Sequence, residues 1–137
     1  MEDLSVVIME KDSETGFLSK ELGSYNVVWD INMIDRIFVI SENDKKAVNL
    51  FITIPGDFED WEFNAILDNY NIEQYSEKVL TMEEDEDSYN PTWIIKFDFI
   101  EDGSRMEEKL NELLEMHDTE VKRVLNDIKS MEEDYKN

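Results

Sequence analysis

The sequence predicts an α+β fold: a mainly antiparallel sheet of about six strands in the order ββββαββα, with one short helix and one long C-terminal helix. Over residues 1–102, short stretches alternate apolar with polar residues, which is typical of strands. Over residues 103–137, apolar residues recur every three or four positions, the spacing of one helix face. We therefore expect residues 1–102 to form the sheet core and 103–137 a helix of the same domain.

Four strands are expected before the first helix. The first, around residues 4–9, is followed by the turn formers of 12–16, which indicate a hairpin into a second strand that ends near Ile31. The third and fourth strands, 34–41 and 47–54, are joined by a polar connection of hairpin length. Connections this short favour antiparallel neighbours.

A short helix and two further strands complete the expected sheet region. Pro55-Gly56 ends the fourth strand, and Asp57 is expected to cap the short helix that follows. Two strands over 78–82 and 93–100 then flank the acidic loop 83–91.

The apolar residues of these strands do not all share one face. In each strand, one set of alternating residues is the more apolar. The apolar residues that we expect on the other face of the sheet are Val7, Met9, Val28, Ile37, Val39, Phe51, Ile94 and Ile100. A second face this apolar is expected to be covered, either by the long helix or by another subunit.

The C-terminal helix is expected to begin after Gly103, since Ser104 and Glu107 have the spacing of a capping box. Its apolar residues follow the alternating four and three spacing of a coiled-coil seam: Leu110, Leu114, His117, Val121, Val124, Ile128, Met131 and Tyr135. A helix of this length is longer than such a domain is wide, so its far end must protrude, bend or pack on a partner. Two interpretations stay open: the helix lies along the sheet, or its second half forms a homodimer through Val121, Val124, Ile128, Met131 and Tyr135.

Charge limits what the protein can bind. The chain holds 35 Asp and Glu against 13 Lys and Arg, a net charge of −22. Such a charge repels nucleic acid, anionic membranes and phosphate-bearing substrates, and it attracts cationic surfaces. We therefore expect a basic protein partner, with no direct binding of nucleic acid or membrane. The hydrophobic fraction of 41% argues for a folded chain rather than an acidic disordered one.

No catalytic, metal or cofactor pattern is found in the sequence. There is no Cys, the glycines are isolated, and the one His, His117, falls on the helix seam, where protonation near pH 6 would place charge in a helix interface. An EF-hand count from Asp85 reaches Asn90 and Lys96 where Gly and Glu are required. We expect no enzymatic activity. The N-terminus has no secretory pattern and no stretch is apolar enough for a membrane span, so we expect a cytoplasmic protein.

Two acidic segments are the candidate partner-binding sites. Residues 72–102 hold ten acidic and two basic residues, which makes this region the most negative per residue. The candidates are Glu83, Glu84, Asp85, Glu86 and Asp87, with a second patch of Phe58, Asp60 and Trp61, whose aromatic rings supply anchors.

The predicted function is a non-enzymatic interaction protein that binds a basic protein. It would imitate nucleic acid in the manner of the small acidic inhibitors that phages direct at restriction or CRISPR machinery. This comparison is based on charge and size alone. Two alternatives are a structural or assembly protein that dimerises through the C-terminal helix, and a small-ligand or enzyme site built from carboxylates.

Overall fold

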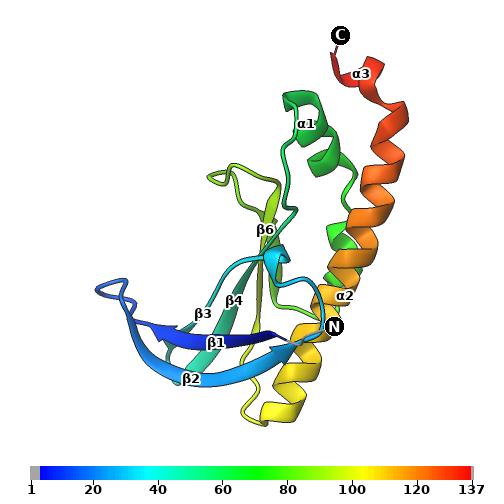
Figure 1. The fold of residues 1–137 in the computed structure, drawn as a ribbon. Helices are drawn as coiled ribbons and strands as arrows, with labels where there is room; N and C mark the ends of the chain where they lie inside the picture. Colours follow the sequence, from blue (N-terminus) through cyan, green and yellow to red (C-terminus); the bar gives the residue numbers. More distant parts are fainter. Residues whose placement is uncertain (1–3, 137) are drawn as a thin grey trace.

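The computed structural model describes residues 4–136, which form one sheet with helices packed beside it (Figure 1). The elements in chain order are β1 (Leu4–Lys11), β2 (Leu18–Val27), the 3₁₀ turn η1 (Ile31–Met33), β3 (Ile34–Glu42), β4 (Lys45–Thr53), α1 (Asp60–Asn69), η2 (Ile72–Tyr75), β5 (Thr81–Glu84), β6 (Thr92–Asp98), α2 (Gly103–Asp127), η3 (Ile128–Ser130) and α3 (Glu132–Lys136).

The sheet has six strands in the order β2-β1-β3-β4-β6-β5, which confirms the predicted α+β class. All neighbouring pairs are antiparallel except β1 and β3, which run parallel over a short register. The sheet is therefore mainly antiparallel, as predicted, with one parallel pair between strands that are not consecutive in the chain. Because β2 pairs with one edge of β1, the chain returns through residues 28–33 and lays β3 along the other edge.

The hydrophobic core lies between the sheet and α2. Figure 1 shows the helices gathered on one side of the sheet, with α2 extending beyond the strands toward α1 and α3. The fully buried side chains of this layer come from α2, β4 and β6: Met106, Leu110, Leu113, Leu114, Val48, Leu50, Ile52, Trp93 and Ile95. Burial of side chains of this size, at about 2 kcal/mol each, supplies the driving force for folding.

The faces of β3 differ from those that we expected. Val39 pairs with Val48 of β4 and is fully buried in the core, so it belongs to the face covered by α2. Phe51 does lie on the opposite face, where the Arg36 guanidinium stacks 4.2 Å from its ring centroid. On that face Val7 stays 48% exposed.

Both predicted helix caps are displaced. The N-cap of α1 is Glu59, not Asp57, and it forms a reciprocal capping box with Glu62. The N-cap of α2 is Asp102, whose carboxylate accepts from the backbone N–H groups of Ser104 and Arg105. Acidic side chains thus cap both helices, as the positive end of a helix dipole favours.

The C-terminal segment is not one continuous helix. It bends through η3 after Asp127 and ends in the short helix α3, which packs on α1. The Tyr135 hydroxyl donates to Asp68 of α1 at 2.9 Å. Of the three alternatives for the far end, the structure therefore shows a bend, followed by packing within the same chain. The last predicted helical residue, Asn137, lies outside the described residues.

Candidate functional site

The acidic loop begins at the end of the edge strand β5. Glu83 and Glu84 are the last residues of β5, and Glu86 and Asp87 follow in the turn; all four side chains are exposed. They are arranged along one short edge of the sheet and make no ion pair with the residues described here. Four of the five predicted loop carboxylates are therefore available to a partner.

Asp85, the fifth, points inward. Its side chain is 9% exposed, accepts from the Ser88 hydroxyl at 2.6 Å and from the Asp87 N–H at 3.2 Å, and lies 3.9 Å from the Arg36 guanidinium. A carboxylate that binds its own turn in this way shapes the loop. Asp85 is thus a residue that positions its acidic neighbours.

The second predicted patch lies at the start of α1. Asp60 is exposed, while Phe58 and Trp61 are partly buried against the core. The Trp61 indole N–H donates to the Glu59 carboxylate at 3.0 Å, which fixes the ring beside the helix cap. The patch therefore combines a fixed aromatic surface with the carboxylates of a helix N-terminus.

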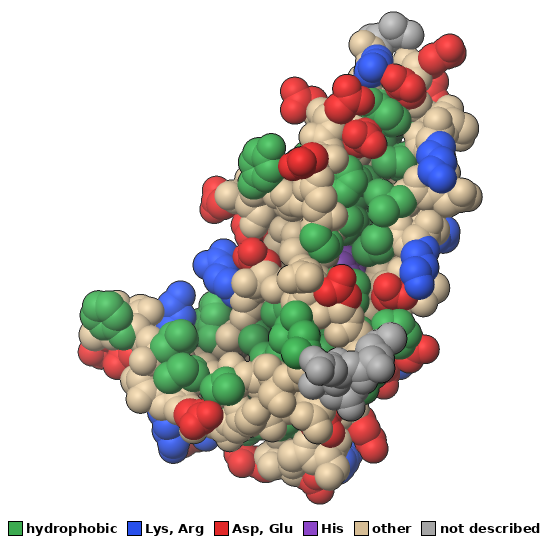
Figure 2. Space-filling view, in the orientation of Figure 1, with side chains coloured by type: hydrophobic (Ala, Val, Ile, Leu, Met, Phe, Trp, Pro, Cys, Tyr) green, Lys and Arg blue, Asp and Glu red, His purple; other side chains and the backbone are tan. Residues whose placement is uncertain are grey.

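Helix α3 adds carboxylates that we did not predict. Glu132, Glu133 and Asp134 form its first turn, and α3 packs on α1. We call the resulting surface the acidic tip, defined by Glu59, Asp60, Glu62, Glu132, Glu133 and Asp134. Figure 2 shows Asp and Glu side chains gathered at this end of the molecule.

Lys136 is a cation set among these carboxylates. It forms an ion pair with Glu132 at 2.8 Å. The hydrogen bond with Glu132 raises the Lys136 pKa above its ordinary value, and the charges of Glu59 and Glu62 raise it further. Since groups from α1 and α3 act on one ammonium, the two helices contribute to a common negative field.

The acidic loop is linked to the segment that leads into α1. Asn90, at the end of the loop, donates to the Ile54 carbonyl at 2.7 Å and to the Gly56 carbonyl at 2.8 Å. Gly56 has a φ of +128°, which favours glycine, and it lies two residues before Phe58 of the second patch. The side-chain amide of Asn90 thus ties the end of the acidic loop to the segment that leads into the second patch.

A comparison with protein-family models matches residues 1–136 to a family of unknown function, DUF6762. The chain belongs to this family. No curated protein matches the chain, and no solved structure matches it.

The predicted oligomerisation residues make contacts within the chain. Val124 and Ile128 are buried in the core, and Met131 lies 3.4 Å from the Asn69 amide of α1. Tyr135 bonds Asp68, as described above, and Val121 is partly buried. Dimerisation through this seam stays a prediction, although α1 already occupies much of the surface that it requires.

No group of three or more His, Cys, Asp or Glu among residues 4–136 is placed to hold a metal ion. Within the same residues, no helix has both the length and the apolar character needed to cross a bilayer.

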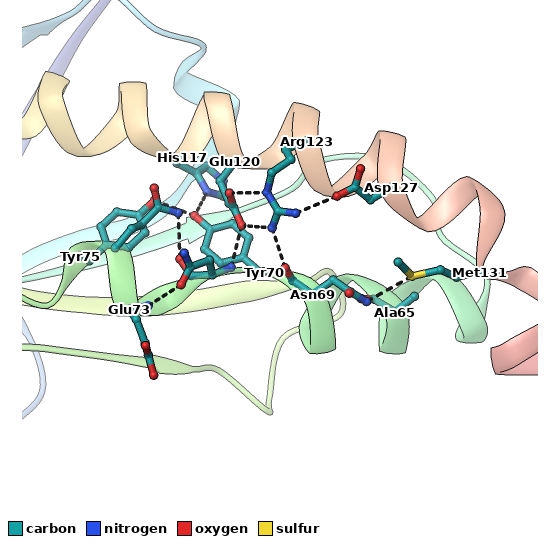
Figure 3. Close-up of polar contacts among 12 residues, drawn as sticks. Ala65, Asn69, Tyr70, Glu73, Tyr75, His117, Glu120, Arg123, Asp127 and Met131 are labelled. Carbon is teal, nitrogen blue, oxygen red and sulfur yellow. Dashed lines mark hydrogen bonds and ion pairs between the residues drawn. The ribbon is translucent and has the colours of Figure 1, made fainter.

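A buried polar network joins α2 to the segment after α1 (Figure 3). The fully buried His117 has Nε2 at 2.8 Å from the Thr53 carbonyl and Nδ1 at 2.8 Å from the Tyr70 hydroxyl. Tyr70 is in turn 2.7 Å from the Tyr75 hydroxyl. Because His117, Tyr70 and Tyr75 each have a hydrogen-bond partner, the network fixes α2 relative to β4 and η2.

An ion pair between the buried Glu120 and the half-exposed Arg123 extends the network toward solvent. The Glu120 carboxylate accepts from the Arg123 guanidinium at 2.6 Å and from the Asn71 backbone N–H at 2.6 Å. Arg123 also donates to the Asn69 carbonyl and to Asp127. Burial alone would raise the pKa of Glu120, but Arg123 and the Asn71 amide lower it below its ordinary value.

Proposed function

We propose that this DUF6762 member is a cytoplasmic, non-enzymatic interaction protein whose acidic tip and loop dock on a basic protein, in the manner of a nucleic-acid mimic. The observation that carries the proposal is the packing of α3 on α1, which brings two acidic helix starts to one end of the fold. The carboxylates there have Lys136 as a cationic neighbour.

Physical chemistry supports a docking role for such a surface. Carboxylates held close together on a folded surface repel one another, and a cationic partner relieves this repulsion on binding. Duplex DNA offers about one charge per 1.7 Å of its axis, and a protein groove that recognises this field also attracts clustered carboxylates. Trp61 supplies an aromatic anchor beside the charges.

The test is a pull-down from a nuclease-treated bacterial lysate with three forms of the protein. One form is unchanged, and one carries Asp60→Asn, Glu132→Gln and Asp134→Asn. The matched control carries Glu14→Gln, Glu73→Gln and Glu115→Gln, which remove the same charge from exposed positions elsewhere. A partner that is retained by the control, lost with the tip variant and displaced by added duplex DNA supports the proposal. Equal retention by all three forms contradicts it.

A further inference from the structure

The basic side chains are not evenly distributed over this acidic protein. Two hollows, of about 480 and 430 Å³, meet at Leu80 and Asp98, which line both. Six of the 13 Lys and Arg residues of the chain line them: Lys45, Lys46, Lys78, Lys96, Arg105 and Lys109. With five acidic lining residues, this groove carries a formal charge of +1, against −22 for the whole chain.

The helix-side hollow lies between α2 and the end of β6. Arg105 and Lys109 line it from α2, and Phe97 and Ile100 supply apolar surface. Lys109 donates to the Lys78 carbonyl at 2.5 Å, which ties the rim of the hollow to the chain before β5. This hollow thus has apolar walls and a cationic rim.

The sheet-side hollow lies around the β3–β4 hairpin and the face of the sheet opposite α2. Lys45, Lys46 and Lys96 line it, together with the side chain of Asn49. None of these three lysines, nor Arg105 of the other hollow, forms an ion pair with the residues the structure describes. Unpaired cations in a chain with 35 carboxylates favour an anionic ligand.

Between the hollows, beyond its pairing with β5, the outer edge of β6 has no strand partner among residues 4–136. The Leu80 N–H donates to the Lys96 carbonyl at 2.7 Å, and before Leu80 the chain turns back toward Tyr75. On the other edge of β6, the Phe99 N–H donates to β4 at the Lys46 carbonyl. Because backbone groups alternate along an antiparallel strand, those of Asp98 point away from β4, into the groove.

We propose that an extended acidic peptide segment binds in this groove by adding to the edge of β6 at Asp98, in line with β5. Strand addition satisfies the free backbone groups and sends alternate side chains to opposite faces. One set of side chains enters the helix-side hollow beside Arg105, and the other meets Lys45 and Lys96. Leu80, 58% exposed where the hollows join, offers an apolar contact to either set.

The net charge of the protein does not prevent this binding at physiological salt. Exposed charges are screened over about 8 Å at 0.15 M ionic strength, so the ligand responds mainly to the side chains that line the groove. At low salt the field of the whole chain opposes an acidic ligand. Affinity for the peptide is therefore expected to rise from low to moderate salt, the reverse of the salt dependence expected at the acidic tip.

The test uses fluorescence anisotropy of a labelled peptide of alternating Glu and Val. We compare the unchanged protein with a variant carrying Lys45→Gln, Lys46→Gln and Lys96→Gln. The matched control carries Lys20→Gln, Lys122→Gln and Lys129→Gln, which remove equal charge from exposed positions outside the groove. We expect the groove variant to bind about tenfold more weakly and the control to change affinity less than about twofold.

A second probe tests strand addition without altering the protein. The same peptide with N-methyl groups on alternate residues keeps its charge but cannot pair with a strand edge, so it should lose binding. Equal affinity for the methylated peptide overturns the proposal, as does equal weakening by both lysine variants or no binding of the Glu-Val peptide. Sedimentation that shows self-association abolished by the groove variant would assign the groove to a second copy, and would also overturn it. The acidic-tip variant should bind this peptide normally, which separates this test from that of the proposed function.

Discussion

The Tyr70 hydroxyl donates a hydrogen bond to Nδ1 of the buried His117. The direction follows from the other ring nitrogen, because the Thr53 carbonyl 2.8 Å from Nε2 can only accept a hydrogen bond. Nε2 therefore carries the proton of the neutral ring, and Nδ1 accepts from Tyr70 at 2.8 Å. Tyr75 then donates to Tyr70 at 2.7 Å. These directions hold for the neutral imidazole, the form that burial favours.

The first prediction concerns the pH dependence of stability. Burial lowers the His117 pKa to about 4, below the ordinary value of 6.5, and the bond to Thr53 offsets this only in part. As pH falls, His117 therefore becomes protonated at a higher pH in the unfolded chain than in the folded protein. The contribution to stability is fully present above pH 6.5 and is lost as pH falls toward 4, by about 3 kcal/mol at most.

Comparison with a His117→Gln variant isolates this contribution, since the acidic groups titrate in both proteins. Glu120 and Asp118, whose charges act on His117, remain in the variant. We expect urea unfolding to show a large stability difference between the two proteins at pH 7, and a smaller one at pH 4.5. A difference independent of pH would show that His117 is not held neutral in the folded state.

The second prediction concerns the ion pair at the end of this network. Arg123→Gln removes the partner of a carboxylate whose side chain is 7% exposed, so Glu120 is left buried without its counter-charge. We expect a loss of about 2 kcal/mol, below the range for a fully buried pair because Arg123 is 45% exposed. The neighbouring Lys122→Gln is the control, since Lys122 is 76% exposed and its pair with Asp118 should contribute less than about 1 kcal/mol. Equal losses in urea unfolding would contradict the assignment.

Sequence periodicity was sufficient to predict the strands of the sheet, but not to predict which side chains of every strand face the core. The hairpin between β3 and β4 could be predicted because a polar turn separates two apolar stretches. Within β3, however, Phe38 and Val39 are both apolar, so alternation does not decide which one faces the helix. The pairing of Val39 with Val48 decides it, and that pairing is a long-range property of the sheet.

The candidate site was predicted in part for a similar reason. A run of carboxylates identifies Glu86 and Asp85 equally, but only the fold shows that Asp85 turns inward to bind Ser88. The contribution of Glu132 and Asp134 depends on the bend after Asp127, since in a straight helix they would lie away from α1. The sequence contains no Pro or Gly there to signal a bend.

The third prediction concerns the exposed edge of β2. Asn111 of α2 takes the place of a neighbouring strand: its side chain accepts from the Val28 N–H at 3.0 Å and donates to the Asn26 carbonyl at 2.9 Å. Asn111→Ala should lower the free energy of unfolding by about 1–2 kcal/mol and leave the Val28 N–H and the Asn26 carbonyl open to solvent. Hydrogen exchange should accelerate at Val28, while the exposed Glu108→Ala leaves it unchanged. Unaltered exchange in Asn111→Ala would show that the side chain does not protect this edge.

The fourth prediction distinguishes charge from shape in the acidic loop. Neutralising Glu83, Glu84, Glu86 and Asp87 together removes exposed charge but leaves the Asp85 turn intact. For a basic partner obtained in the pull-down, long-range attraction acts mainly on encounter, so the association rate should fall severalfold with little change in dissociation.

Asp85→Asn provides the contrast for this prediction. It removes one largely buried charge and weakens the contacts to Ser88 and Arg36, so it should reduce thermal stability while leaving the association rate close to that of the unchanged protein. Stopped-flow binding at two salt concentrations measures both variants. If the variant with all four carboxylates neutralised associates at the rate of the unchanged protein, the exposed loop carboxylates do not accelerate association. Docking must then depend on the acidic tip alone.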